Sequence, residues 1–204
     1  VPAYVELWVA DMNRHITLLC AHPDDEVIFG WPVLQQAKKI ICCSSDLNNP
    51  ERAWCKDRKL ALKEIGQKVG AEVICLDYNS EFYRLPTRDG SLMRLANDIL
   101  SLLGQEDILF THNPWGEYGH LYHMLVHQVA LLSGKRLLFS DISLEAGWIP
   151  SGKRSLSEKM VGSFGNDLSF YSECKAIYDS FGCWTWSKPP VMETRVYEDH
   201  NGNS

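Results

Sequence analysis

Short uninterrupted hydrophobic runs alternate along the chain with longer segments in which hydrophobic and polar positions mix. Such runs are typical of β-strands covered on both faces, whereas the mixed segments have the spacing of amphipathic helices. The runs predict strands at 15–21, 39–45, 72–77, 107–112 and 136–142. The mixed segments predict helices at about 26–37, 51–69, 90–104 and 120–133.

The predicted helix over 51–69 shows the periodicity clearly. Leu60, Ile65 and Val69 fall roughly along one face, and lysines occupy other positions. Gly70 follows directly and can end the helix, because glycine adopts the left-handed conformation of a C-terminal cap without strain. The alternation predicts an α/β fold, a Rossmann-like three-layer sandwich with a mostly parallel central sheet. Its binding site is expected at the carboxyl ends of the strands.

Beyond the fifth predicted strand this alternation weakens. The pattern there predicts a loop at 144–157, a strand at 159–162, a helix at 168–181 and a strand at 191–197. The polar tail 199–204 is predicted to be frayed. A chain of 204 residues predicts one domain over 1–204, with its clearest part at about 15–143 and a less regular C-terminal portion at 144–198.

Composition excludes several classes of protein. Hydrophobic residues make up 45% and charged residues 23%, which argues against long disorder. The net charge of −6 and the absence of a basic block exclude nucleic acid as an expected partner. The hydrophobic runs are too short to form a transmembrane segment. Seven cysteines, several of them inside hydrophobic runs, predict buried thiols and a cytoplasmic location. The oligomeric state is left open.

Charged side chains are concentrated directly after the first predicted strand, in the sequence His22-Pro23-Asp24-Asp25-Glu26. The proline disfavours helical geometry at the residue before it and therefore delays the next helix. Acidic residues at a helix start are also ordinary capping residues, which is the alternative interpretation. Glu26 is expected to support the loop or one of the ligands.

Histidines are concentrated after the fourth predicted strand, at the same edge of the sheet. On a helix that begins just before His120, His120 and His123 share a face, and His127 points broadly the same way. This spacing does not decide which pair would bind a metal. His112 and His127 are predicted to be structural or to support the ligands.

Together these motifs contain the groups that metal-dependent amide hydrolysis requires. Two imidazoles and one carboxylate hold a divalent metal with open positions for a water and for the substrate carbonyl. A neighbouring carboxylate takes a proton from that water, and an imidazole provides one to the leaving amine. The adjacent residues Asp24 and Asp25 allow one carboxylate to bind the metal and the other to act as base.

The segments Ala21–Glu26 and Tyr118–His123 resemble the two signatures of the PIG-L/LmbE-like deacetylases. This family includes N-acetylglucosaminyl-phosphatidylinositol de-N-acetylases and the bacillithiol and mycothiol pathway deacetylases. The resemblance extends from about 15 to 143. It implies removal of an N-acetyl group from an amino sugar or glycoconjugate, with a metal-bound water attacking the amide carbonyl. It also implies a small-molecule partner and Zn²⁺, or Fe²⁺, as cofactor.

The resemblance also implies roles for individual residues. The implied metal ligands are His22, Asp25 and His123. Asp24 is the implied general base, and His120 is implied to act as an acid or to stabilise the charged intermediate. Tyr118 is implied to contact the substrate or the oxyanion. Arg58 matches a family arginine that would contact sugar or phosphate oxygens; the alternative is a solvated arginine on a helix face. The sequence departs from the family pattern at two places. Ala61 stands where the family usually has an acidic residue, and Leu121-Tyr122 stands where it often has Pro-Asp. These differences leave the identity of the substrate open.

Further candidates for substrate binding border the motifs. Asn113 and Glu117 could bind hydroxyls or orient His120, and the alternative for Asn113 is an ordinary turn. Trp184 and Trp186 could stack on a sugar, or anchor a loop.

Three alternative functions remain. One is an amidase or deacylase of a non-sugar or thiol-conjugate amide, and another is a non-catalytic carbohydrate-binding protein. A nucleotide binder is disfavoured, because the glycine-rich fingerprint is missing after the first strand.

Overall fold

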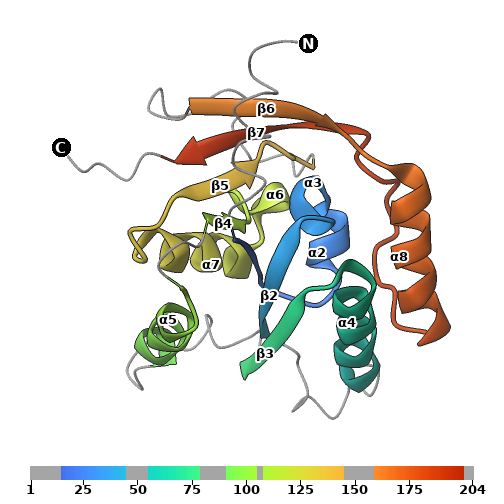
Figure 1. Cartoon of the computed structure of the whole chain (residues 1–204), viewed down its shortest axis with the longest axis horizontal. Coiled ribbons are helices and arrows are strands. Elements are labelled where there is room, and N and C mark those ends of the chain that lie inside the picture. The colour runs from blue at the N-terminus through green and yellow to red at the C-terminus, as the bar shows by residue number, and fades with distance from the viewer. Residues whose placement is uncertain (1–14, 45–54, 79–90, 105–107, 145–158, 200–204) are drawn as a thin grey trace.

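One seven-stranded sheet organises the chain. The structure is a computed structural model that describes residues 15–44, 55–78, 91–104, 108–144 and 159–199 (Figure 1). In these ranges the strands follow the order β3-β2-β1-β4-β5-β7-β6. Their bounds are β1 Ile16–Cys20, β2 Ala37–Ser44, β3 Glu72–Tyr78, β4 Ile108–Thr111, β5 Leu137–Ser140, β6 Lys159–Gly165 and β7 Glu193–Asp199.

The first five strands pair in parallel, whereas β7 runs antiparallel to both β5 and β6. The predicted α/β fold with a mostly parallel sheet is therefore confirmed. The strands predicted in the C-terminal portion are also present. Asp199, placed in the predicted frayed tail, belongs to β7, and 200–204 lie outside the described residues. The predicted loop 144–157 also lies outside them, except for Leu144.

The described helices are α2 Asp25–Ile28, α3 Trp31–Leu34, α4 Cys55–Val69, α5 Ser91–Ser101, α6 Gly116–Gly119, α7 Leu121–Leu131 and α8 Leu168–Ser180. The predicted single helix over 26–37 is wrong, because two short helices and the start of β2 occupy this stretch. Gly30 separates the helices and packs so closely on β1 that an added Cβ would lie 2.8 Å from Leu18 Cδ2. Pro32 then lies in the first turn of α3, where its missing N–H costs no hydrogen bond.

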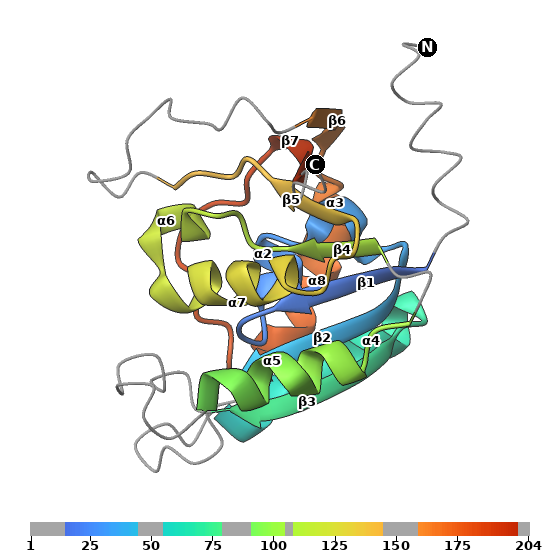
Figure 2. The same ribbon diagram turned by 90° about the vertical axis from the view of Figure 1, so that its left-hand side faces the viewer.

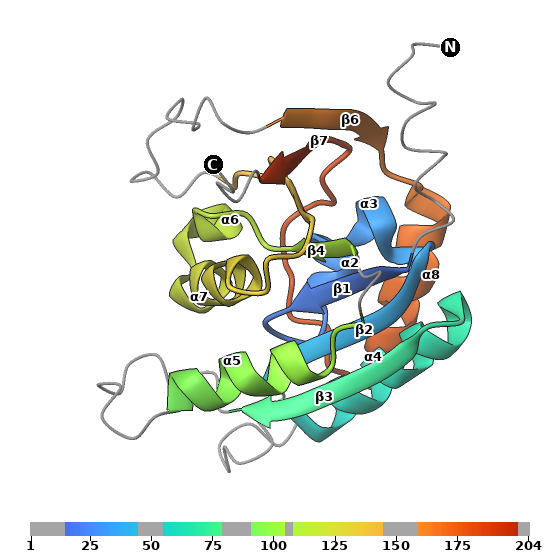
Figure 3. The ribbon, with the colours of Figure 1, turned by 60° about the vertical axis from the view of Figure 1, so that its left-hand side comes forward.

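Two hydrophobic cores fill the space between the sheet and its helices. On one face, α3, α4 and α8 cover alternate residues of the central strands, including Leu18 and Ile40. On the other face, α5 and α7 cover the intervening residues, including Leu19 and Ile41. Figures 1 and 3 show the resulting three layers. None of the helices in the described ranges is long and apolar enough to cross a membrane.

The cysteines are consistent with this packing. Cys20, Cys42, Cys43, Cys174 and Cys183 are buried free thiols, and Cys75 is a partly buried one. The first three belong to the central strands β1 and β2, where each acts as a small hydrophobic side chain.

Candidate metal centre

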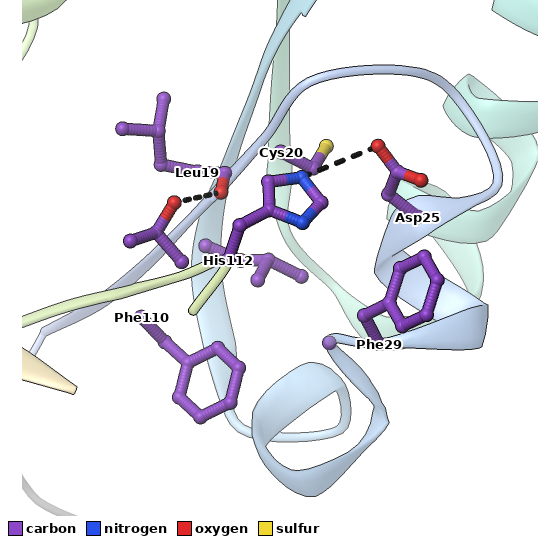
Figure 4. Close-up of a pocket in the computed structure, with 9 residues that line it drawn as sticks. Leu19, Cys20, Asp25, Phe29, Phe110 and His112 are labelled. Carbon is purple, nitrogen blue, oxygen red and sulfur yellow. Dashed lines mark hydrogen bonds and ion pairs between the residues drawn. The ribbon is translucent and has the colours of Figure 1, made fainter. Parts of the chain in front are cut away.

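The loops that follow β1 and β4 meet at one edge of the sheet, because these strands are parallel neighbours. The Thr111 hydroxyl donates to the Leu19 carbonyl at 2.8 Å and joins the two strand ends. Figure 4 shows the ring of His112, from the loop after β4, directed toward Asp25 of α2. The two motifs found in the sequence therefore lie side by side.

Three donor atoms converge where these loops meet. Asp25 Oδ2 lies 3.3 Å from His22 Nδ1 and 3.5 Å from His123 Nε2. The two histidine nitrogens are 3.3 Å apart. Around a tetrahedral Zn²⁺ with bonds of about 2.0–2.1 Å, ligand atoms lie about 3.3–3.4 Å apart. The spacing of the donors in this chain therefore fits a divalent ion of that size.

The position of the His123 ring proton is compatible with a cation at this point. His123 Nδ1 lies 2.7 Å from Glu117 Oε2, and a carboxylate at that distance holds the ring proton on Nδ1. The lone pair of His123 Nε2 then faces Asp25 Oδ2, and two lone pairs at this distance repel each other. A cation between them removes that repulsion. A carboxylate behind a ligating histidine is also the usual support of a metal-binding imidazole.

His112 also lies beside this cluster, with its ring stacked on that of His123 at a centroid distance of 3.8 Å. Asp25, His112 and His123 could form an alternative ligand group. However, Ala21 N donates to His112 Nε2 at 3.0 Å, which occupies that lone pair. Burial disfavours a charged His112 ring, yet Glu117 and Asp25 raise its pKa to about 10. We favour a neutral His112 ring, because only a neutral ring can accept the hydrogen bond from the Ala21 N–H at Nε2. A cation bound to Asp25 would also lower the pKa of His112 by opposing the effect of the Asp25 charge.

His127 has a structural position. Its Nδ1 lies 2.7 Å from the His112 carbonyl oxygen, and its Nε2 lies 3.5 Å from Asp199 Oδ2 on β7. The side chain is fully buried and belongs to neither group of candidate ligands. It links the loop after β4 to the last described strand.

His120 stands at the start of α7 and caps it. Its Nδ1 accepts a hydrogen bond from Tyr122 N at 3.2 Å, and its ring stacks on His123 with centroids 4.3 Å apart. Burial, together with His123 and His22, lowers the pKa of His120 to about 3. The neutral ring therefore carries its proton on Nε2. Another group of side chains that could hold an ion consists of His22, His120 and His123. In this group, however, the hydrogen bond that caps α7 already occupies His120 Nδ1.

Asp24 is held in a strained conformation beside the candidate ligands. Its φ of 97° is left-handed, which is unusual for a residue with a side chain, and only 3% of its surface is exposed. Glu26 Oε2 accepts the Asp24 N–H at 2.9 Å and thereby fixes the turn. Burial raises the pKa of Asp24, and the nearby Arg58 opposes that rise.

Arg58 of α4 is buried rather than solvated, so the alternative of a solvated helix-face arginine is wrong. Its Nη2 lies 2.5 Å from Asp24 Oδ1, and the same group donates to the Pro23 carbonyl. Arg58 therefore fixes the loop that carries Asp24. Contact between Arg58 and a substrate remains a prediction.

Asn113 and Glu117 face inward and bind neighbouring parts of the chain, so the structure gives them a structural position, and their contact with a substrate stays a prediction. Both are fully buried. Asn113 Oδ1 accepts Glu117 N at 2.9 Å, and Asn113 Nδ2 donates to Ile142 O at 2.6 Å. Glu117 Oε1 accepts Asn113 N at 3.1 Å, while its Oε2 supports His123. These residues hold the loop after β4 in shape, as the turn interpretation of Asn113 anticipates.

Tyr118 lies at the margin of the centre. Its ring centroid is 5.6 Å from those of both His120 and His123, and 5.8 Å from that of Trp186. Burial raises the pKa of Tyr118, so its hydroxyl stays protonated and can donate a hydrogen bond. Trp184, by contrast, packs against Tyr178 on the core side of α8. The two tryptophans considered together in the sequence thus have different surroundings.

The C-terminal third supplies contacts that sequence reasoning missed. The Tyr178 hydroxyl donates to Glu26 Oε1 at 2.6 Å, and the Thr185 hydroxyl donates to Asp24 Oδ2 at 2.8 Å. For Thr185, the sequence signal was the pair of tryptophans on either side of it, which drew attention to the aromatic rings and not to the threonine.

Comparisons with known proteins give limited similarity in sequence. No protein-family model matches the chain. It is 25% identical over 130 residues to the uncharacterized protein L374 of Acanthamoeba polyphaga mimivirus. That alignment covers 55% of this chain and 54% of the viral protein, so the chain spans about half the length of this curated relative.

Solved structures are more similar in shape. A deacetylase triple mutant from the teicoplanin biosynthetic pathway has a TM-score of 0.64 at 13% identity, covering 93% of this chain and 100% of its own. The A40926 pseudoaglycone deacetylase Dbv21 has a TM-score of 0.62 at 12% identity, covering 90% and 96%. A zinc-inhibited form of the teicoplanin deacetylase Orf2 has a TM-score of 0.61 at 10% identity, covering 89% and 97%. The chain shares the fold of these deacetylases. At such identities the likeness extends to the fold alone.

Replacing Glu117 with glutamine is expected to weaken metal affinity by about 10–100-fold, because the carboxylate behind His123 is lost. Competition with a chromophoric chelator measures this change. Glu173→Gln on the exposed face of α8 is the matched control and should leave affinity unchanged. Equal affinity in Glu117→Gln and the unaltered protein would exclude a supporting role for Glu117.

Proposed function

We propose that this chain is a metal-dependent hydrolase that removes an N-acetyl group from an amino sugar or glycoconjugate. One observation carries the proposal: donor atoms of His22, Asp25 and His123 converge at 3.3–3.5 Å, with the carboxylate of Asp24 adjacent in the chain. Asp24 completes the pair of carboxylates that such hydrolysis needs, one on the metal and one free to accept a proton.

The ion that we propose for this centre is Zn²⁺, with Fe²⁺ as the alternative, held by His22, Asp25 and His123. When bound, it supplies a Lewis acid that polarises an amide carbonyl and makes a water more acidic. The nitrogen and oxygen donor set of these residues suits either ion.

The side chains around the ion divide the remaining tasks. Asp24 accepts a proton from the attacking water, since its carboxylate is buried and held in place by Arg58. His120 presents an Nε2 proton, because its Nδ1 is occupied by the helix cap, and this proton stabilises negative charge on the former carbonyl oxygen. The Tyr118 hydroxyl is a second donor for the same oxygen. The departing amine receives the proton that Asp24 took from the water, so Asp24 returns to its ionised form.

The substrate class rests on the family resemblance and on the structural neighbours. Those neighbours are described as deacetylases of teicoplanin biosynthesis and of the A40926 pseudoaglycone. We propose that residues 1–204 form one such deacetylase domain that acts in the cytoplasm. A deacylase of a non-sugar amide would use the same side chains. A non-catalytic sugar-binding protein is disfavoured, because it would not need both a convergent donor set and a buried neighbouring carboxylate.

Chelation is expected to abolish acetate release, and one equivalent of Zn²⁺ or Fe²⁺ should restore it. Zn²⁺ should not be added in excess, because one structural neighbour is described as a zinc-inhibited form. The assay measures acetate released from N-acetylglucosamine derivatives, with acylated amines and thiol conjugates as comparison substrates. Full turnover at less than one-tenth of an ion per chain would contradict the proposal. Sugar binding by calorimetry without acetate release, at every metal loading, would favour the binding protein instead.

A further inference from the structure

The segment between α8 and β7 passes beside the candidate metal centre. Figures 2 and 3 show it crossing the edge of the sheet at which β1 ends. Trp184 anchors this segment against Tyr178 of α8, and the Trp186 ring lies 5.6 Å from that of Phe29. Thr185, between these two anchors, is exposed overall but directs its hydroxyl inward.

That hydroxyl donates to Asp24 Oδ2 at 2.8 Å, across 161 positions of the chain. The other oxygen, Asp24 Oδ1, is paired with Arg58 Nη2 at 2.5 Å. Two donors from separate elements thus hold the two oxygens and fix the plane of the carboxylate. Each carboxylate oxygen has two lone pairs, so one on each oxygen remains free to accept a proton.

We infer that Thr185 is a positioning residue that holds Asp24 in the orientation needed to deprotonate water. This inference rests on the proposed function. Arg58 alone fixes one oxygen and leaves the carboxylate free to turn about that contact, whereas Thr185 fixes the second. Small errors in the placement of a catalytic group lower the rate strongly. Loss of the Thr185 hydroxyl should therefore lower turnover and leave substrate affinity nearly unchanged.

Thr185→Val keeps the shape of the side chain and removes its donor. We expect kcat to fall by about 10–100-fold, since a hydrogen bond to a charged group is lost, while KM changes by less than about two-fold. Thr185→Ser restores the donor and should return kcat to within about two-fold of the unaltered protein. The metal content of all three proteins should be equal.

Thr194→Val is the matched control. Thr194 also donates its hydroxyl to an aspartate, Asp141 Oδ1 at 2.9 Å, but on the antiparallel part of the sheet. This variant removes the same kind of hydrogen bond without touching Asp24. It should leave kcat unchanged, which separates the role of Thr185 from a general loss of stability.

A double-mutant cycle tests the contact independently of activity. Thr185→Val should lower the melting temperature in the unaltered protein, but by much less in the Asp24→Ala background, where the acceptor is missing. Equal shifts in both backgrounds would mean that the contact does not exist and would overturn the inference. The kinetic comparison does not require Asp24→Ala to fold.

The remaining outcomes are also decisive. Unchanged kcat in Thr185→Val, or failure of Thr185→Ser to restore it, would overturn the inference while leaving the proposed function intact. If the unaltered, metal-loaded protein releases no acetate from any substrate tested, the proposed function fails and the inference fails with it. The two failures are therefore distinguishable.

Discussion

Replacing Asp24 with asparagine is expected to lower kcat by about 10²–10⁴-fold, the contribution of a general base, while bound metal stays at one ion per chain. Asparagine keeps the shape of the side chain and cannot accept a proton at neutral pH. It is preferable to alanine, because Asp24→Ala leaves the buried Arg58 without its partner, and stranding a buried charge costs about 3–5 kcal/mol. Turnover is measured by acetate release, and metal by elemental analysis.

The Asp24 experiment needs a check on folding, since the aspartate also completes a buried ion pair. Circular dichroism and melting temperature should show that Asp24→Asn remains folded at the assay temperature. A folded, metal-loaded variant that keeps turnover within about three-fold of the unaltered protein would contradict the assignment of a general base. Asp24 would then serve only as the partner of Arg58 and Thr185.

Replacing Asp25 with alanine should remove the metal itself and reduce acetate release to background. Asp25 Oδ2 is the one carboxylate oxygen among the three converging donor atoms. The same oxygen accepts His22 N at 2.7 Å, so its loss also frees the loop that carries a second candidate ligand. We expect less than about one-tenth of an ion per chain after dialysis, because two neutral imidazoles alone hold a divalent ion weakly.

Asp179→Asn provides the control for Asp25→Ala. Asp179 lies on the exposed face of α8 and pairs with Lys175, a contact of small value, so this variant should keep both metal and turnover. If Asp25→Ala instead retains a full equivalent of metal, the ligand assignment is wrong. The group formed by His22, His120 and His123 would then be the better candidate for the ion.

The strands of the sheet were predictable because each one is marked by a hydrophobic run within its own sequence. Strands covered on both faces must be hydrophobic along their whole length, and β1, β4 and β5 are buried throughout. The break between α2 and α3 was missed for the opposite reason. It depends on the approach of Gly30 to Leu18 on β1, which is a contact between elements that hydrophobic periodicity does not reveal.

The candidate site was also predictable only in part. That the segments carrying His22 and His123 would lie close together was predictable, because loops after parallel neighbouring strands meet at one edge of the sheet. The choice of His22, Asp25 and His123 as ligands came from the family resemblance and not from this geometry. The inward orientation of Asn113 was not, since the same residue types also occur on exposed turns. The contact between Thr185 and Asp24 depends on how the C-terminal segment packs, and threonine carries no pattern that marks it as a partner of a distant carboxylate.

The place of β7 in the sheet links the edge of β5 to the candidate metal centre. This strand, the last that the structure describes, lies between β5 and β6. Among the described strands, β7 alone pairs with this edge of β5 and alone joins β6 to the sheet, and an edge left unpaired can pair with other chains. Thr185 lies in the segment that leads into β7, and its hydroxyl donates to Asp24. The strand that covers the edge of β5 is therefore continuous with the segment that places a hydroxyl beside the proposed base, so damage to the packing of β7 is expected to disturb both.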